Sequence, residues 1–173
     1  MNFIKILLDR YRRYKNPIKY WRKKGLIIGE ECELRSSFFG SEPYLIKIGN
    51  HVRINARVEF VTHDGGAWVL RHYSSVENAE NITIFGRIEI GDNVHIATNV
   101  TIMPNVRIGN NCIIGCGAIV TKDIPDNSIA VGIPARVIET ISDYEEKNKE
   151  RFCFTKNFSR AETREFLKNR YKL

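Results

Sequence analysis

Residues 88–124 read IEIGDNVHIATNVTIMPNVRIGNNCIIGCGAIVTKDI, and aliphatic residues return in this stretch every six positions. Two such series, four residues apart, run through the stretch and just before it. The first holds Ile84, Ile90, Ile96, Ile102, Ile108, Ile114 and Val120, and the second holds Ile88, Val94, Val100, Val106, Cys112, Ala118 and Ile124. A period of six matches neither a helix nor a simple strand alternation, and a fixed repeat of this kind indicates a solenoid.

A hexad supplies one short strand and one turn, so three hexads make a triangular coil. The aliphatic side chains of each coil then stack on those of the coils above and below. The same pattern extends upstream with two sets of inward positions, Ile28, Leu34, Ile48, Ile54 and Phe60, and Cys32, Phe38, Val52 and Val58. The sequence therefore predicts an all-β solenoid that begins near residue 26.

Two insertions interrupt the period. The step from Leu34 to Ile48 is 14 residues instead of 12, which predicts a bulge of residues 41–43 at a corner. The step from Phe60 to Ile84 is 24 residues, and within it residues 63–81 break the inward pattern. We interpret 63–81 as an extruded loop, and loops of this length inside compact domains are usually functional or disordered. Its histidines, tryptophan and acidic residues favour a chemical role.

The composition narrows the class of protein. A chain of 173 residues with 43% hydrophobic residues is long enough for one domain with a real core. The net charge is +7, yet residues 1–24 alone carry +8, so the rest of the protein is nearly neutral. A basic arm on a neutral body does not favour a nucleic-acid partner.

The cysteine spacing and the hydropathy favour a cytoplasmic protein. Cys32, Cys112, Cys116 and Cys153 do not form the paired motifs of a zinc ribbon, and no secretory signal is recognisable. We expect reduced thiols in a cytoplasm. No apolar run approaches the ~20 residues of a membrane-spanning helix.

The hexads resemble those of the left-handed parallel β-helix acyltransferases, the hexapeptide-repeat family that includes galactoside, maltose, serine and xenobiotic acetyltransferases. The string IGNNCIIGCGAIVTKDIPDNSIAVGIPARVI, residues 108–138, is similar to the C-terminal signature of that family, and the resemblance covers residues 28–138. The strings FGSEPYLIKIG and FVTHDGGAWVLR further resemble bacterial enzymes that O-acetylate capsular or lipopolysaccharide sugars. The left hand of the helix follows from the resemblance alone.

Acyl transfer to a hydroxyl needs a base with a pKa near neutral, and histidine is the usual one. In the resembling enzymes the catalytic base is the histidine at the start of the extruded loop, which is His63 here. We expect a solvated or turn role for His51, no direct role for His72, and a place lining the cofactor groove or a purely structural role for His95.

A histidine that accepts a proton at one ring nitrogen needs the other nitrogen held by an acceptor. Asp64, Glu42 or a backbone carbonyl could supply it, and the sequence does not choose among them. Glu42 could instead face the acceptor sugar or be an exposed corner carboxylate. We also expect Asp64 and Trp68 near the substrate.

The resemblance implies acetyl-CoA as acyl donor and no metal. The residues at matching cofactor positions are Thr98, Cys116, Thr121, Lys122 and Arg136, with His95 beside them. Lys122 and Arg136 suit the phosphates of CoA, although both could be merely solvated. Cys116 departs from the usual small residue and is still tolerable in size. The resemblance also implies a homotrimer whose active sites lie between subunits.

The chain divides into a basic helical arm (1–25), the β-helix domain (26–140) and a C-terminal helical extension (141–173). In the arm, Ile4, Leu7, Leu8, Tyr11 and Tyr14 form an apolar helical stripe, and Pro17 interrupts the helix. We expect the stripe to cap the mouth of the solenoid. The alternative is a weak contact with an anionic membrane surface, at the cytoplasmic face. Ser159 and Glu162 form a capping-box pattern that predicts a helix after residue 159.

These features together predict a cytoplasmic O-acetyltransferase that acts on a sugar hydroxyl in surface polysaccharide synthesis. A serine or other small-molecule acetyltransferase is the main alternative. A γ-class carbonic anhydrase needs three zinc histidines, which the histidine spacing here does not favour. A non-catalytic scaffold would leave the loop unexplained.

Overall fold

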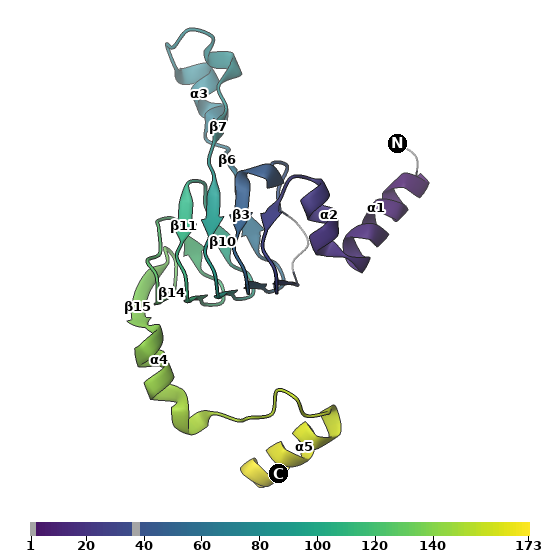
Figure 1. Cartoon of the computed structure of the whole chain (residues 1–173). Coiled ribbons are helices and arrows are strands. Elements are labelled where there is room, and N and C mark those ends of the chain that lie inside the picture. The colour runs from purple at the N-terminus through teal and green to yellow at the C-terminus, as the bar shows by residue number, and fades with distance from the viewer. Residues whose placement is uncertain (1–2, 36–38) are drawn as a thin grey trace. The chain divides into compact units, whose positions relative to one another are not determined.

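The structure is a computed structural model that describes residues 3–35 and 39–173. Its core is a stack of short strands, and helices follow at both ends of the chain and in one loop (Figure 1). The strands are β1 (Ile27–Ile28), β2 (Glu33–Leu34), β3 (Ile46–Ile48), β4 (Arg53–Ile54), β5 (Glu59–Phe60), β6 (His63–Asp64), β7 (Ile84–Phe85), β8 (Ile88–Ile90), β9 (Val94–Ile96), β10 (Thr101–Ile102), β11 (Val106–Ile108), β12 (Cys112–Ile114), β13 (Ile119–Val120), β14 (Ser128–Val131) and β15 (Arg136–Thr140). The helices are α1 (Phe3–Lys15), α2 (Pro17–Lys23), α3 (Ala67–Tyr73), α4 (Ile141–Asn148) and α5 (Arg160–Tyr171), with 3-10 turns η1 (Pro43–Leu45), η2 (Ala79–Asn81) and η3 (Lys149–Arg151).

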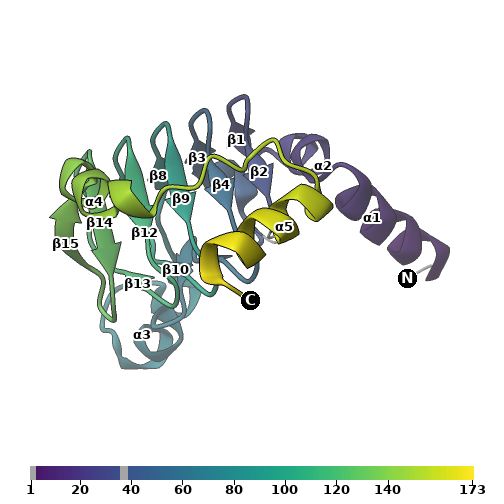
Figure 2. The same cartoon turned by 90° about the horizontal axis from the view of Figure 1, so that it is seen from below.

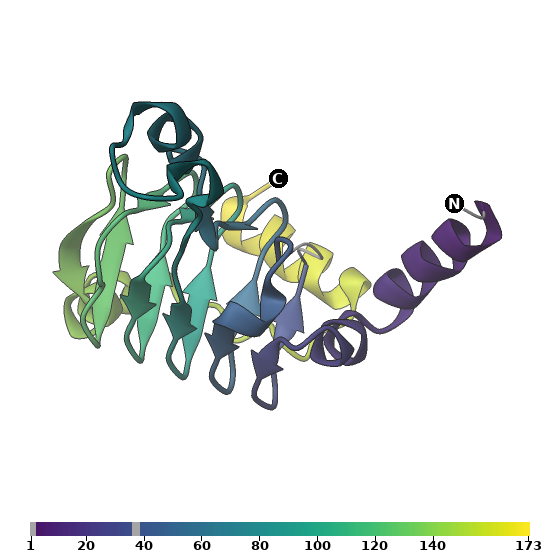
Figure 3. The same ribbon diagram turned by 90° about the horizontal axis from the view of Figure 1, so that it is seen from above.

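The stacked strands form three faces. The first face has the order β1-β3-β8-β11, the second β2-β4-β9-β12-β14-β15, and the third β5-β10-β13. Neighbouring strands pair in parallel and in register, except that β15 pairs antiparallel with β14 at the end of the second face. The coils β3-β4-β5, β8-β9-β10 and β11-β12-β13 visit the three faces in turn, and the views from below and above show how the strands stack (Figures 2 and 3). We call the turns after the first, second and third faces the first, second and third corners.

The predicted inward positions form the core. From Ile88 to Ile124 every member of both six-residue series is buried, most of them completely. The interior is thus a column of aliphatic side chains, each stacked on its counterparts in the next coils.

Ile84 is a predicted core position that lies outside the core. It lies in β7, where it pairs with Asp64 of the loop, and its side chain is 37% exposed. Its match to the six-residue period was therefore misleading. Upstream, Leu34 and Cys32 are only partly buried, and Phe39 is fully buried. The predicted inward residue Phe38 lies outside the described residues.

The first corner carries a ladder of side-chain amides. Asn93 Nδ2 donates to Asn111 Oδ1 (2.9 Å), and Asn111 Nδ2 donates to Asn127 Oδ1 (2.8 Å). All three have φ between 52° and 58°, a region that asparagine tolerates better than most residues. His51 occupies the same position one coil earlier, with φ 53°, and its Nδ1 donates to Asn93 Oδ1 (2.8 Å). The predicted turn role of His51 is its role in the structure.

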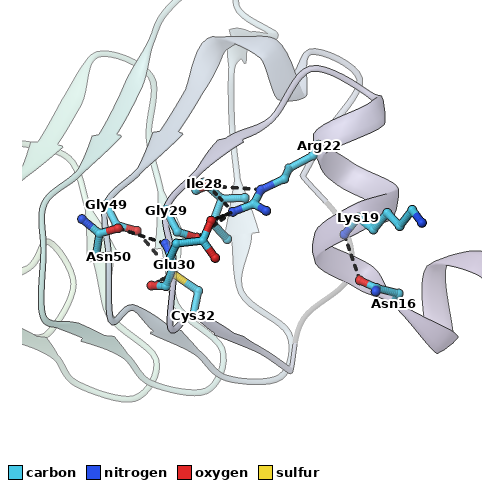
Figure 4. Close-up of polar contacts among 9 residues, drawn as sticks. All are labelled: Asn16, Lys19, Arg22, Ile28, Gly29, Glu30, Cys32, Gly49 and Asn50. Carbon is cyan, nitrogen blue, oxygen red and sulfur yellow. Dashed lines mark hydrogen bonds and ion pairs between the residues drawn. The ribbon is translucent and has the colours of Figure 1, made fainter.

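Helix α2 covers the first coil. Trp21 is 5% exposed, and its ring lies edge-on to that of Phe39 (centroids 5.3 Å apart). The Arg22 guanidinium donates to the backbone oxygens of Ile28 (2.8 Å) and Gly29 (3.0 Å) and to the Glu30 carboxylate (2.8 Å; Figure 4). The expectation that the arm caps the solenoid therefore needs a correction in its residues. Trp21 covers the core, while the stripe residues Leu7, Leu8, Tyr11 and Tyr14 stay about half exposed or more.

The loop leaves the third corner on an antiparallel stem. His63 pairs with Phe85 and Asp64 with Ile84, which gives the two-residue ladder of β6 and β7. Beyond the stem, α3 and η2 pack on each other, with Ala67 and Ala79 buried. The Arg71 guanidinium donates to the backbone oxygen of Ile82 (2.9 Å). The extruded segment therefore folds back on itself beyond the stem (Figure 1), with Ala67 and Ala79 buried inside it.

The chain separates into two compact units, residues 1–142 and 143–173. Within the second unit, α5 begins at the predicted capping box. The Ser159 backbone N–H donates to the Glu162 carboxylate (2.7 Å), and the Glu162 N–H donates to Ser159 Oγ (3.3 Å). These two bonds satisfy backbone donors of the first turn, as the sequence pattern predicted.

Candidate active site

The candidate base lies at the third corner, where both insertions meet. Residues 41–43 bulge from the first coil, and η1 follows at once with Glu42 as its N-terminal cap residue. One coil further, the chain passes Thr62 and enters the stem at His63. Because successive coils stack, Glu42 and His63 lie beside each other although 21 residues separate them.

Three side chains meet at this place. His63 Nδ1 lies 3.1 Å from Glu42 Oε2, and Thr62 Oγ1 donates to the same carboxylate oxygen over 2.7 Å. Glu42 is largely buried, with 14% of its side chain exposed, whereas the His63 side chain is 50% exposed. Thr62 therefore holds the Glu42 carboxylate, and the His63 imidazole remains open to a ligand.

The carboxylate sets the tautomer of the histidine. The hydroxyl of Thr62 is the largest influence that holds the pKa of Glu42 below its usual value; partial burial opposes it, and Ser41 and His63 add to it. An ionised carboxylate only accepts, so His63 Nδ1 donates to it and carries the ring hydrogen. Nε2 then has a free lone pair, which is the state that a general base needs. Of the acceptors left open by the sequence, the structure selects Glu42.

Asp64 and Trp68 take other positions in the loop. Asp64 Oδ1 accepts from the Gly66 backbone N–H (2.7 Å), so this carboxylate shapes the turn into α3. Trp68 lies on α3 and is 70% exposed. The ring of Phe85 lies edge-on to His63 with centroids 6.5 Å apart. The stem thus supplies an apolar wall beside the candidate base.

The predicted cofactor residues occupy several places in the stack. Thr98 and Cys116 lie at the second corner in successive coils, where the Gly117 N–H donates to the Thr98 backbone oxygen (3.0 Å). Thr121 and Lys122 follow β13 at the third corner, two coils beyond the His63 loop. All of these side chains are at least partly exposed, and Cys116 is a free thiol.

Arg136 begins β15, and its guanidinium donates to the Ala135 backbone oxygen (2.9 Å). Ala135 is joined through its own N–H to the Ile119 backbone oxygen (2.8 Å), which holds this segment against β13. His95 lies on the second face, in β9, between Arg53 and Ile113 of the adjacent strands. Burial, with the charge of Arg53 as a second cause, lowers the pKa of His95. His95 therefore lies on the second face, whereas His63 lies in the stem at the third corner.

Thr62 is the site residue that sequence reasoning missed. It is 1% exposed and its hydroxyl reaches Glu42, yet the sequence pattern marks it only as part of the string around His63. A polar residue directly after the inward series and before the candidate base was the available signal. Phe85 was missed because the period assigns it to the first strand after the loop rather than to the stem.

Two absences hold within residues 3–35 and 39–173. In these ranges no three His, Cys, Asp or Glu side chains come together so that they could hold a metal ion. None of the helices described is long and apolar enough to span a membrane.

Known proteins match the repeat and, beyond it, most of the chain. The family described as bacterial transferase hexapeptide (six repeats) matches residues 87–122. Protein CapG of Staphylococcus aureus is 47% identical over 155 residues, which cover 87% of each chain. The galactoside O-acetyltransferase of Escherichia coli K12 is 39% identical over 129 residues, which cover 73% of this chain and 60% of that relative.

Solved structures agree with these relatives. A galactoside acetyltransferase in complex with coenzyme A superposes with a TM-score of 0.54 at 27% identity, over 82% of this chain and 75% of that one. A maltose O-acetyltransferase from Clostridium difficile 630 gives a TM-score of 0.52 at 28% identity, over 70% and 73% of the two chains. The chain therefore belongs to the bacterial hexapeptide-repeat transferase family. Within that family it is an acetyltransferase.

Proposed function

We propose that this acetyltransferase moves acetyl from acetyl-CoA to a hydroxyl of a sugar, in the synthesis of a surface polysaccharide. The observation that carries the proposal is the contact of His63 Nδ1 with the buried Glu42 carboxylate, which leaves Nε2 open at the base of the folded loop. The sugar is supported by the named activities of the galactoside and maltose acetyltransferases. The coenzyme A complex of the former supports the donor.

In the proposed reaction His63 Nε2 accepts the proton of the sugar hydroxyl as the oxygen attacks the thioester carbonyl. The tetrahedral oxyanion accepts a hydrogen bond from a backbone N–H. Its collapse breaks the carbon–sulfur bond, and the imidazolium returns the proton to the CoA thiolate. Glu42 keeps the ring in the required tautomer and stabilises the imidazolium while it exists.

The acceptor and donor residues complete the proposal. Asp64 and Trp68 contact the sugar from the loop. Thr98, Cys116, Thr121 and His95 line the groove for the pantetheine arm, while Lys122 and Arg136 bind CoA phosphates through charge-assisted hydrogen bonds. We infer no metal in the reaction.

The proposal includes a left-handed coil and a homotrimer in the cytoplasm. The base lies at the third corner, whereas Thr98 and Cys116 lie at the second. A site completed by a neighbouring copy would bring such separate corners together. We expect sedimentation equilibrium to give a molar mass three times that of one chain.

The direct test is CoA release from acetyl-CoA with a panel of acceptors. We expect turnover with a sugar or glycoside and none with L-serine. Acetyl-CoA should also raise the melting temperature by mass action, and dephospho-CoA should raise it less, because one phosphate partner of Lys122 or Arg136 is missing. Turnover with L-serine and with no sugar would refute a sugar as the acceptor. Equal shifts of the melting temperature with acetyl-CoA and dephospho-CoA would refute the phosphate-binding roles of Lys122 and Arg136.

A further inference from the structure

The two N-terminal helices form an elbow, which we define as residues 7–23. Helix α1 ends at Lys15 and α2 begins at Pro17, whose fixed φ suits the first turn of a helix. Asn16 caps α2 by accepting from the Lys19 N–H (3.0 Å). The Tyr20 hydroxyl donates to Asp9 (2.8 Å), so the two helices hold each other.

The inside of the elbow is hollow and strongly basic. A cavity of about 400 Å³ lies there, lined by Arg12, Lys15, Lys19 and Lys23 together with the rings of Tyr11 and Tyr20. No carboxylate is among the lining residues that the structure describes. The Asp9 carboxylate of α1 accepts a hydrogen bond from Tyr20, one of the lining residues. The hollow therefore suits an anion.

An apolar strip lies next to this hollow. Leu7, Leu8 and Tyr11 are 49%, 47% and 56% exposed, and Tyr14 is 88% exposed. Their spacing of three and four residues places them on one side of α1, while Asp9, the residue bonded to α2, lies on another. Tyr11 belongs to both the strip and the wall of the hollow.

The first coil fixes the elbow in place. Trp21 is buried and its ring packs against Phe39. Arg22 is bonded to Ile28, Gly29 and Glu30 (Figure 4). Neither Trp21 nor Arg22 lines the hollow, so other residues of α2 anchor it to the first coil than those that face the hollow. The exposed strip and the four cations are thus not needed to close the solenoid. Their exposure calls for a separate explanation.

The combination decides the kind of partner. Four cations without an apolar strip would suit a free phosphate or a nucleic acid, whereas leucines beside the cations suit the boundary between lipid headgroups and acyl chains. A second copy of this elbow would bring like charges together, which is unfavourable.

We propose that the elbow binds an anionic bilayer, with the strip of α1 in the interface and a lipid phosphate in the hollow between the helices. The binding is electrostatic and interfacial, so it weakens with salt and needs anionic lipid. This inference is independent of the acceptor sugar and of the reaction, because lipid binding is measured without turnover.

The test is flotation of the full chain with vesicles of phosphatidylcholine, with and without phosphatidylglycerol, at low and high salt. We expect flotation only with phosphatidylglycerol and at low salt. Replacing the hollow's cations (Arg12→Gln, Lys15→Gln, Lys19→Gln, Lys23→Gln) should weaken the binding about tenfold or more. Replacing the strip (Leu7→Gln, Leu8→Gln) should weaken it similarly, with the net charge unchanged.

The matched control removes four charges elsewhere, by Lys156→Gln, Arg160→Gln, Arg164→Gln and Lys168→Gln. This variant should bind like the parent, and all three variants should keep the parent's melting temperature within a few degrees. Equal loss in the control would show that charge acts without location, which overturns the proposal. A second outcome also overturns the proposal: the strip variant still floats with the vesicles, and inorganic phosphate or RNA releases it from them. The hollow would then bind a soluble anion rather than a bilayer.

Discussion

The first and third corners of the same solenoid differ in regularity. At the first corner, Asn93, Asn111 and Asn127 repeat one hydrogen bond from coil to coil, and the partners Asn93 and Asn111 are 18 residues apart. At the third corner, the bulge of residues 41–43 and the loop of 63–81 break the repeat, and the partners Glu42 and His63 are 21 residues apart.

The difference shows where a solenoid can hold chemistry. A repeated corner satisfies its polar groups within the ladder, so its side chains are already engaged. An interrupted corner can present different residues from neighbouring coils, here a largely buried carboxylate beside a half-exposed imidazole. Stability is therefore shared along the first corner, and the candidate reactivity gathers at the third.

The largest expected effect is at the third corner. His63→Ala should lower the rate of CoA release with a sugar acceptor by about 10²- to 10⁴-fold, the usual contribution of a general base. The melting temperature should hardly change, because the side chain is half exposed. His72→Ala, in the same loop, is the matched control and should keep the parent rate. A near-normal rate in His63→Ala would show that another residue is the general base.

Glu42→Gln should lower kcat by about 10- to 100-fold, because the imidazolium loses a charge-assisted hydrogen bond of ~1.5–3 kcal/mol. KM for acetyl-CoA should stay near the parent value, since Glu42 contacts the base and not the donor. A steady-state analysis over pH separates this role from a structural one. If Glu42→Gln raises the KM of either substrate and leaves kcat unchanged, Glu42 binds that substrate instead of positioning His63.

At the first corner, the expected effect is on stability only. Asn111→Ala removes two ladder bonds and places alanine at φ 52°, which should cost roughly 1–2 kcal/mol of unfolding free energy. Asn111→Gly should cost less, because glycine tolerates this φ. Urea denaturation measures both, and the specific activity should equal that of the parent. If both variants lose the same unfolding free energy, the positive φ at this position contributes nothing to the difference in stability.

The smallest expected effect is a pH dependence of stability. The pKa of Glu42 is lower in the folded chain than its usual value of 4.5, so below 4.5 the unfolded chain binds the proton more readily. The contribution of this group is fully present above pH 4.5 and is lost as the pH falls through the folded value. Glu42→Gln should therefore show a flatter decline of unfolding free energy in this window. Parallel curves for the two proteins would contradict the lowered pKa of Glu42 as the cause.

The two corners also explain how far sequence reasoning reached. The six-residue period predicted the buried face of every strand from Ile88 to Ile124, since each inward position meets its counterpart one coil away. Where the period and the local pairing disagree, as at Ile84, the antiparallel stem takes precedence and the residue leaves the core. The expectation that the stripe of the first helix caps the solenoid was wrong, because the stripe residues stay exposed and Trp21 on a second helix covers the first coil instead.

The sequence by itself determined the repeat, and it marked residues 41–43 and 63–81 as local departures from a fixed period. It also singled out His63 among the histidines, from its place at the start of the loop and from the family resemblance, and that role stays a prediction. Only the tertiary structure decided which acceptor holds His63. Asp64 is adjacent in sequence, yet its carboxylate caps the next turn, and Glu42 arrives from the preceding coil. The physical reason is that stacking joins residues about one coil apart, and which side chains meet beside an insertion depends on the path that the inserted residues take in the folded chain.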